Sequence, residues 1–139
     1  MITIINIAKK YSVTAVILVV ASVLLTGCFV KPIYNVDNRT FSTEAKLPLG
    51  TVKQNIKVIG ADRGWLFEDV APGHMIGKIG DLKHNAKVDI FYTEKSFSIK
   101  YLDSYNLKKD NDTIHFRYNR WIEFFERDLV AKLGLASSS

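Results

Sequence analysis

The sequence has a single cysteine, Cys28, among its 139 residues. An intramolecular disulfide needs two cysteines, so the hydrophobic core alone must hold this fold together. Regular structure is expected only from Thr51 to Gly134, which is 84 residues. A domain of that size has a thin margin of stability without disulfides, and we expect Trp65, Trp121 and the phenylalanines to fill its core.

The sequence also carries little excess charge. Its 19 basic and 14 acidic residues give a net charge of +5, and without residues 1–27 the charge is +3 over 112 residues. The two signs are interspersed along the chain rather than gathered in runs. A positive field strong enough to demand nucleic acid is therefore not implied, and we expect a solvated surface of mixed charge and no nucleic-acid partner.

Motifs of nucleophilic catalysis are missing as well, since neither G-x-S-x-G nor S-x-x-K occurs. Glu68 and Asp69 are adjacent acids, but successive residues of a strand point to opposite faces, so the two cannot flank one glycosidic bond. His74, His84 and His115 lack the i, i+3 or i, i+4 spacing that places two metal ligands on one helical face. We expect no catalytic residue, no metal and no cofactor; an enzyme with an unrecognised site is the less favoured alternative.

What the sequence does have is a basic segment followed by an apolar run at its start. Lys9 and Lys10 precede Val13–Leu25, an apolar run of 13 residues. A membrane-spanning helix needs about 20 apolar residues, whereas the core of a signal peptide needs about 7 to 15. The run therefore predicts a signal peptide. Extended through Val30 it approaches the length of an uncleaved N-terminal anchor, which stays open as the alternative.

The residues that follow this run, Leu25-Thr26-Gly27-Cys28, resemble the lipobox of bacterial lipoproteins. The resemblance implies that residues 1–27 are a lipoprotein signal peptide, cleaved between Gly27 and Cys28. It also implies that the Cys28 thiol carries a diacylglyceryl group as a thioether and that the freed amine of Cys28 is acylated in many bacteria. Each buried methylene contributes about 0.8 kcal/mol, so two or three acyl chains make a lasting anchor.

The resemblance also bears on location and partners. The partner it implies is membrane lipid, bound through the acylated Cys28. Phe29 follows the cysteine where an aspartate would favour the inner membrane under the enterobacterial sorting rule. The outer membrane is therefore the expected location, with the domain facing the periplasm. No free thiol remains for catalysis in such a mature chain.

The rest of the chain divides into a tether and one domain. Residues 28–50 contain two prolines and no sustained periodicity, which predicts the lipidated N-terminus and a tether, with a short strand at Ile33–Val36 as an option. Residues 51–139 are expected to form an α+β domain. Its first helix starts at a capping box of Thr51 and Gln54, presents apolar residues at i, i+4 and i+7, and can end at Gly64.

Strand patterns occupy the middle of the domain and a second helix ends it. A short strand at Met75–Ile79 precedes a hairpin in which apolar residues alternate over Ala86–Tyr92 and again over Ser96–Asp103. The helix from about Thr113 to Leu133 has a broad apolar stripe, with the pairs Glu123/Arg127 and Asp128/Lys132 on its outer side. The order α-β-β-β-α predicts two layers, a three-to-four-stranded antiparallel sheet with both helices on its apolar face.

Three residues are candidates for a binding surface. Tyr105 lies in the polar loop before the last helix, and loops carry function more often than cores do. Arg117 and Arg120 belong to the run RYNRW, which interleaves basic and aromatic residues as single-strand binders do. Because Tyr118 and Trp121 fall on the buried stripe, nucleic acid is disfavoured. Phosphorylated lipid headgroups or lipopolysaccharide are the targets we hypothesise for the two arginines.

The second half of the domain contains RGW, PG, H.A.VDI.Y and, most distinctively, DSYNL at Asp103–Leu107 and IHFRYNRWI at Ile114–Ile122. Through these motifs the segment from residue 63 to residue 129 is similar to a group of small bacterial lipoproteins of no known activity. Small lipoproteins of the outer-membrane barrel-insertion machinery share size and anchor, but they open with two helices. We therefore expect a lipid-anchored envelope protein with a non-catalytic binding or structural role. The alternative is an accessory subunit of an outer-membrane assembly, and an envelope protein partner is expected.

Overall fold

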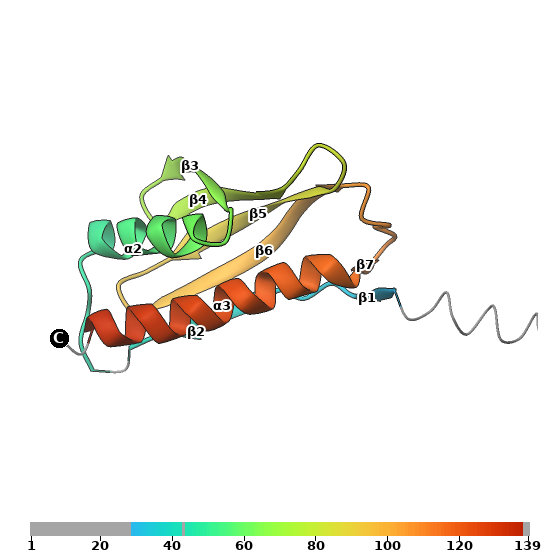
Figure 1. Ribbon diagram of the computed structural model, residues 1–139. Coiled ribbons are helices and arrows are strands. Elements are labelled where there is room, and N and C mark those ends of the chain that lie inside the picture. Colours follow the sequence, from blue (N-terminus) through green and yellow to red (C-terminus); the bar gives the residue numbers. More distant parts are fainter. Residues whose placement is uncertain (1–28, 43, 138–139) are drawn as a thin grey trace, which may run out of the picture.

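The computed structural model describes residues 29–42 and 44–137 (Figure 1), so the predicted signal peptide, Gly27 and Cys28 lie outside the described residues. The described chain contains two helices and seven strands, in the order β1 (Val30–Pro32), β2 (Val36–Thr40), α2 (Leu49–Ala61), β3 (Leu66–Ala71), β4 (His74–Gly80), β5 (Asn85–Tyr92), β6 (Ser96–Tyr105), β7 (Thr113–His115) and α3 (Phe116–Ser137). Neither of these helices is long and apolar enough to cross a membrane.

The main sheet has five antiparallel strands in the spatial order β2-β6-β5-β4-β3, and β1 pairs with β7 in a separate two-stranded sheet. The predicted hairpin is confirmed as β5 and β6, with Ile90 opposite Ile99. Alternation puts Ala86, Val88, Ile90 and Tyr92 inside, because side chains of a strand point to the two faces in turn. Both helices pack on this apolar face, so the α+β class and the two layers are also confirmed (Figure 1).

The predicted strand count and the order α-β-β-β-α were wrong. Four strands are added to the three of that order, and two of them, β1 and β2, come from the segment expected to be a tether. The optional strand at Ile33–Val36 was misplaced, because only Val36 lies in a strand, at the start of β2. In β2 only Val36 is buried, and Asp37, Asn38, Arg39 and Thr40 are exposed. Such a polar segment shows no apolar alternation. It joins the sheet because its backbone pairs with the edge of β6, where Val36 faces Ile99.

Helix α2 confirms its predicted end but not its predicted start. The helix begins at Leu49 behind Pro48, and no side chain caps it, so the Thr51/Gln54 capping box was wrong. At the other end Gly64 has a φ of +85°. The N–H of Trp65 donates to Gly60 O and that of Gly64 donates to Ala61 O, both at 3.0 Å, which is the Schellman pattern of a glycine stop.

Helix α3 starts three residues later than predicted, at Phe116, because Thr113–His115 form β7. It also continues past the predicted end at Leu133, through Gly134 to Ser137. Its predicted apolar stripe is confirmed, since Tyr118, Ile122, Phe125 and Leu129 are all 0% exposed.

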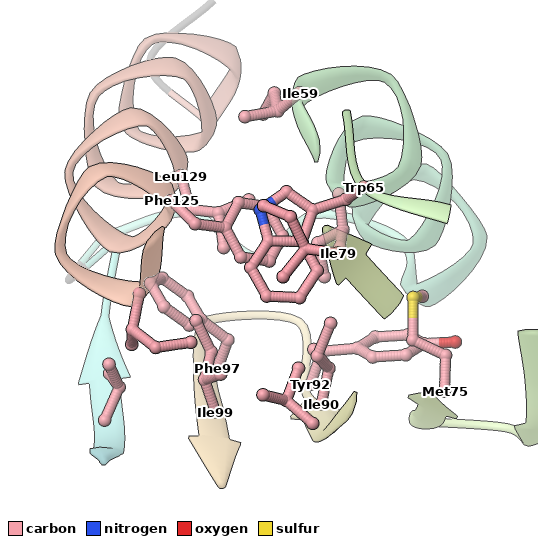
Figure 2. Packing of buried hydrophobic residues seen from close by; sticks show 14 of the residues in the cluster. Ile59, Trp65, Met75, Ile79, Ile90, Tyr92, Phe97, Ile99, Phe125 and Leu129 are labelled. Carbon is pink, nitrogen blue, oxygen red and sulfur yellow. The ribbon is translucent and has the colours of Figure 1, made fainter. Parts of the chain in front are cut away.

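The two helices meet the sheet around Trp65, which the stop at Gly64 directs into the core. Its indole stacks on the ring of Phe125 from α3 at 5.0 Å and an interplanar angle of 26°. Figure 2 shows Trp65 between the two helices, above the alternate residues of the strands. Room for the indole comes from Gly77 of β4, where a Cβ atom would lie 3.1 Å from the Trp65 ring. The expectation that Trp65 fills the core is thus confirmed. It was wrong for Phe29 and Phe91, which are exposed, and Trp121 is only partly buried.

Candidate functional site

The three predicted surface residues are all exposed, but they do not share one site. Tyr105 is at the end of β6 with 61% of its surface exposed. Arg117 is in the first turn of α3, where its charge acts on Asp81 and His115. Arg120 is one turn further along α3 and lies over the ring of Phe124, 5.7 Å from its centroid. The structure therefore assigns Arg117 and Arg120 to different surroundings.

Arg120 belongs to a cluster of arginines around one aromatic ring. The guanidinium carbons of Arg63 and Arg127 each lie 5.0 Å from the centroid of the Phe124 ring, and that of Arg120 lies 5.7 Å from it. Arg120, Phe124 and Arg127 are spaced i, i+4, i+7, so they occupy one face of α3. Arg63 reaches them from the turn after α2. We call these four residues the Phe124 cluster.

One carboxylate, that of Asp128, holds Arg63 and Arg127 in place without cancelling the charge of the cluster. Arg63 Nε donates to Asp128 Oδ2 at 2.5 Å, and Arg127 Nε lies 3.4 Å from Asp128 Oδ1. The hydrogen bond from Arg63 lowers the pKa of Asp128 below its usual value, so the carboxylate stays ionised. Lys132 pairs with Asp62 at 3.4 Å. The i, i+4 partnership predicted for Asp128 and Lys132 is thus replaced by bridges to the end of α2. Arg127 pairs with Asp128 instead of its predicted partner Glu123.

The cluster borders a groove of about 360 Å³ between the end of α2 and α3. Apolar and aromatic side chains line it together with the paired charges, namely Trp65, Ile79, Trp121, Phe124, Asp62, Arg63, Asp128 and Lys132. Arginine and tryptophan are the side chains most enriched at the centres of protein interfaces. The arrangement can bind an acidic group through the guanidinium forks while an apolar group fills the groove.

A second polar contact connects the start of the fold to α3. Tyr34 Oη donates to Glu126 Oε2 at 2.6 Å, and Arg39 Nε lies 3.5 Å from Glu126 Oε1. This hydrogen bond, helped by burial, raises the pKa of Tyr34 to about 12. Asn119 adds two bonds to the same segment, accepting from the Tyr34 N–H at 3.0 Å and donating to Pro32 O at 2.8 Å. We interpret these contacts as structural, because every group in them has a partner within the fold.

The acids and histidines considered in the sequence are dispersed. Glu68 pairs with Lys78 of β4 and Asp69 pairs with Lys57 of α2, each at 2.9 Å, which confirms that the two acids point to opposite faces. His74 Nε2 lies 2.7 Å from Asp89 Oδ1. Across residues 29–42 and 44–137, the structure contains no group of three or more His, Cys, Asp or Glu residues able to hold a metal ion.

Sequence reasoning found Arg120 but missed its companions. Phe124 and Arg127 could have been found, since they continue the face of Arg120 at helical spacing. Arg63 could not, because it reaches the cluster only through the turn at Gly64. Comparisons of the chain with models of protein families, with curated proteins and with solved structures return no match.

Proposed function

We propose that this protein is a bacterial envelope lipoprotein, anchored through an acylated Cys28 at the outer membrane and facing the periplasm, that acts by binding a protein partner. The anchor rests on the sequence, in which a basic segment, an apolar run, Leu-Thr-Gly and the sole cysteine follow in order. The binding role rests on the Phe124 cluster.

The observation that carries the binding role is the crowding of guanidinium groups on one ring. Arginines on an aromatic face gain about 0.5–1 kcal/mol each where they are exposed, and more once water is excluded. Bringing like charges together is unfavourable, and the single carboxylate of Asp128 offsets only part of it. An acidic partner surface would relieve the remaining repulsion and desolvate the ring, which is how arginine and aromatic residues contribute most at interfaces.

The partner we propose is a protein rather than a lipid headgroup. The groove beside the cluster is lined by Trp65, Ile79 and Trp121, which suits an apolar side chain next to a carboxylate. A headgroup phosphate would use the guanidinium groups alone and leave the partly exposed indole of Trp121 uncovered; Trp65 and Ile79 are already covered, at 1% and 9% exposed. An accessory role in an outer-membrane assembly is one form that this function can take.

The anchor is tested by comparing the wild type with Cys28→Ala by intact mass and membrane fractionation. We expect the wild type to lack residues 1–27, to carry the mass of acyl chains and to sediment with outer membranes. Cys28→Ala should do none of these. Wild-type protein that keeps residues 1–27 in the inner membrane would instead support the uncleaved anchor.

The binding role is tested by placing a photoreactive amino acid at Arg120 in cells and, as a matched control, at Lys46, which is exposed in the loop before α2. We expect one discrete crosslinked protein from position 120 and none from position 46. Adding Phe124→Ala should abolish that crosslink. Crosslinks of equal yield from both positions would argue against a defined partner at the cluster.

A further inference from the structure

The fold begins immediately after the proposed anchor. The Phe29 carbonyl accepts a hydrogen bond from the Phe116 N–H at 2.9 Å, and Val30 is already paired with His115 in the β1–β7 sheet. One residue of extended chain spans at most about 3.6 Å. A lipid on Cys28 would therefore be attached one residue before the first hydrogen bond of the fold, in place of the tether that the sequence predicted over residues 28–50.

The end of the molecule around Phe29 is built from segments that are far apart in the sequence. Figure 1 shows β1, β7, the start of α3, the β4–β5 turn and the β6–β7 loop at this one end, opposite the C-terminus. Asn106 Nδ2 donates to Lys83 O at 3.0 Å and the His115 N–H donates to Leu107 O at 2.8 Å, which joins the loops to each other and to β7. We call this surface the Phe29 end.

Exposed apolar and cationic side chains coincide on the Phe29 end. Phe29, Leu82 and Tyr105 are 49%, 96% and 61% exposed. Lys108 Nζ lies 5.9 Å from the centroid of the Phe29 ring, which also stacks on His115 at 6.3 Å. Lysine with aromatic side chains is the combination found where proteins meet lipid headgroups, because apolar bodies reach inward while charged or polar tips stay in water.

The charge at this end is only mildly positive. Its segments carry the cationic side chains of Lys31, Lys83, Lys108, Lys109 and Arg117 and the carboxylates of Asp81, Asp110 and Asp112. Asp81 is engaged, since its Oδ1 accepts from the N–H groups of Lys83 and His84 at 2.7 and 2.9 Å. Such a surface neither binds a bilayer strongly by itself nor repels one. Contact with a membrane must come from the neighbouring acyl chains.

We infer that the Phe29 end is the surface with which the domain rests directly on the phospholipid leaflet that holds its anchor. The inference rests on the proposed acylation of Cys28. With this end on the bilayer, α3 leads away from the membrane, and Phe124 lies about 12 Å along the helix from Phe116 at 1.5 Å per residue. The groove beside the Phe124 cluster then opens sideways, within reach of a partner embedded in the same membrane.

The test uses the mature, lipidated protein in phospholipid vesicles that contain no other protein. Its only native thiol is spent on lipid, so an introduced cysteine can be labelled alone with a fluorophore. We choose Leu82→Cys and Lys31→Cys at the Phe29 end and Ala131→Cys as the control, about 22 Å along α3 from Phe116. All three native residues are exposed, so the substitutions leave the core intact.

A quencher attached to the lipid headgroups should reduce the fluorescence at positions 82 and 31 several-fold more than at position 131. Equal quenching at the three positions, or stronger quenching at 131, would overturn the orientation. Intact mass and flotation with the vesicles report the anchor separately. Protein without acyl mass that does not float would overturn the anchor and this inference with it, whereas floating protein with equal quenching overturns the orientation alone.

Discussion

The two faces of the five-stranded sheet are made by the same strands but are held in different ways. On the face covered by the helices, Met75, Ile90 and Ile99 are opposite one another in β4, β5 and β6, and all are 0% exposed. On the outer face, His74 pairs with Asp89 at 2.7 Å and Glu68 with Lys78 at 2.9 Å.

The difference shows where the stability of this small domain resides. Full burial of a large apolar side chain contributes about 1.5–3 kcal/mol to the free energy of unfolding. An opposite-charge pair across strands contributes only about 0.2–1 kcal/mol. The covered face must therefore supply most of the stability, while side chains on the outer face are free to change with little cost to the fold.

The largest expected effect compares two phenylalanines across this divide. Phe125→Ala removes a ring that is 0% exposed and stacked on Trp65, and we expect the free energy of unfolding to fall by about 3–5 kcal/mol. Phe91→Ala removes a ring that is 44% exposed and stacked on His74 at 4.4 Å, with a loss below about 1.5 kcal/mol. Urea denaturation followed by circular dichroism measures both. Equal losses would contradict the division of the sheet into two energetic classes.

A smaller effect tests how closely the covered face is packed. In Gly77→Ala the new Cβ would lie 3.0 Å from Ile90 Cδ1 and 3.2 Å from Val88 Cγ2, so we expect a loss of about 1–3 kcal/mol from overpacking. Gly50→Ala is the matched control, because its Cβ meets nothing within 4 Å and alanine favours the helix by about 0.5–1 kcal/mol. The midpoint of thermal unfolding should fall for Gly77→Ala and rise for Gly50→Ala. A higher midpoint for Gly77→Ala would show that the core around residue 77 is not tightly packed.

The core between the covered face and α3 also contains a polar group that we expect to be dispensable. The Tyr118 hydroxyl is buried and has no hydrogen-bond partner among the described residues, and burial raises the pKa of this tyrosine. Tyr118→Phe should leave the free energy of unfolding unchanged or raise it by up to about 1 kcal/mol. Tyr101→Phe is the contrast, since Tyr101 Oη is 2.9 Å from Ser104 Oγ and its loss should cost about 0.5–1.5 kcal/mol. Clear destabilisation by Tyr118→Phe would reveal a partner for the hydroxyl.

The smallest effect concerns the outer face. The hydrogen bond from Lys78, and then its charge, lower the pKa of Glu68 below the ordinary 4.5. The pair therefore stabilises the fold above the ordinary pKa, and this contribution is lost as the pH falls through the lowered value. In Lys78→Gln the pKa of Glu68, followed by NMR of its carboxyl carbon, should return towards 4.5. Added salt should reduce the difference in the Glu68 pKa between wild type and variant. If the substitution leaves this pKa unchanged, a group other than Lys78 lowers it.

The sequence predicted the elements whose structure is determined by side-chain periodicity or by a glycine. The helix stop at Gly64, the β5–β6 hairpin and the stripe of α3 all follow from apolar spacing or from a glycine with positive φ. Strand β2 could not be found in this way, because it is held by backbone hydrogen bonds and buries only Val36.

The candidate site divides in the same manner. Arg120 was expected at the surface of α3, since its position follows from helical spacing. The contact of Arg63 with the Phe124 ring depends on where the chain turns after α2 and on how closely α2 and α3 approach. Both are properties of the packed fold. A local pattern of residues contains no information about that approach.

The pairing of the first strands has a consequence for the order in which the protein can fold. The chain is synthesised from its N-terminus, so β2 cannot pair at Val36 until Ile99 has been made. In the same way β1 cannot pair at Val30 until His115 has been made. Closing such long loops is slow, and an unpaired strand is a template for aggregation in the meantime. In β2 the four residues after Val36 are exposed and include Asp37 and Arg39, a composition that resists wrong pairing. Strand β2, which stays unpaired during most of synthesis, therefore has a composition that disfavours pairing with a strand of another chain.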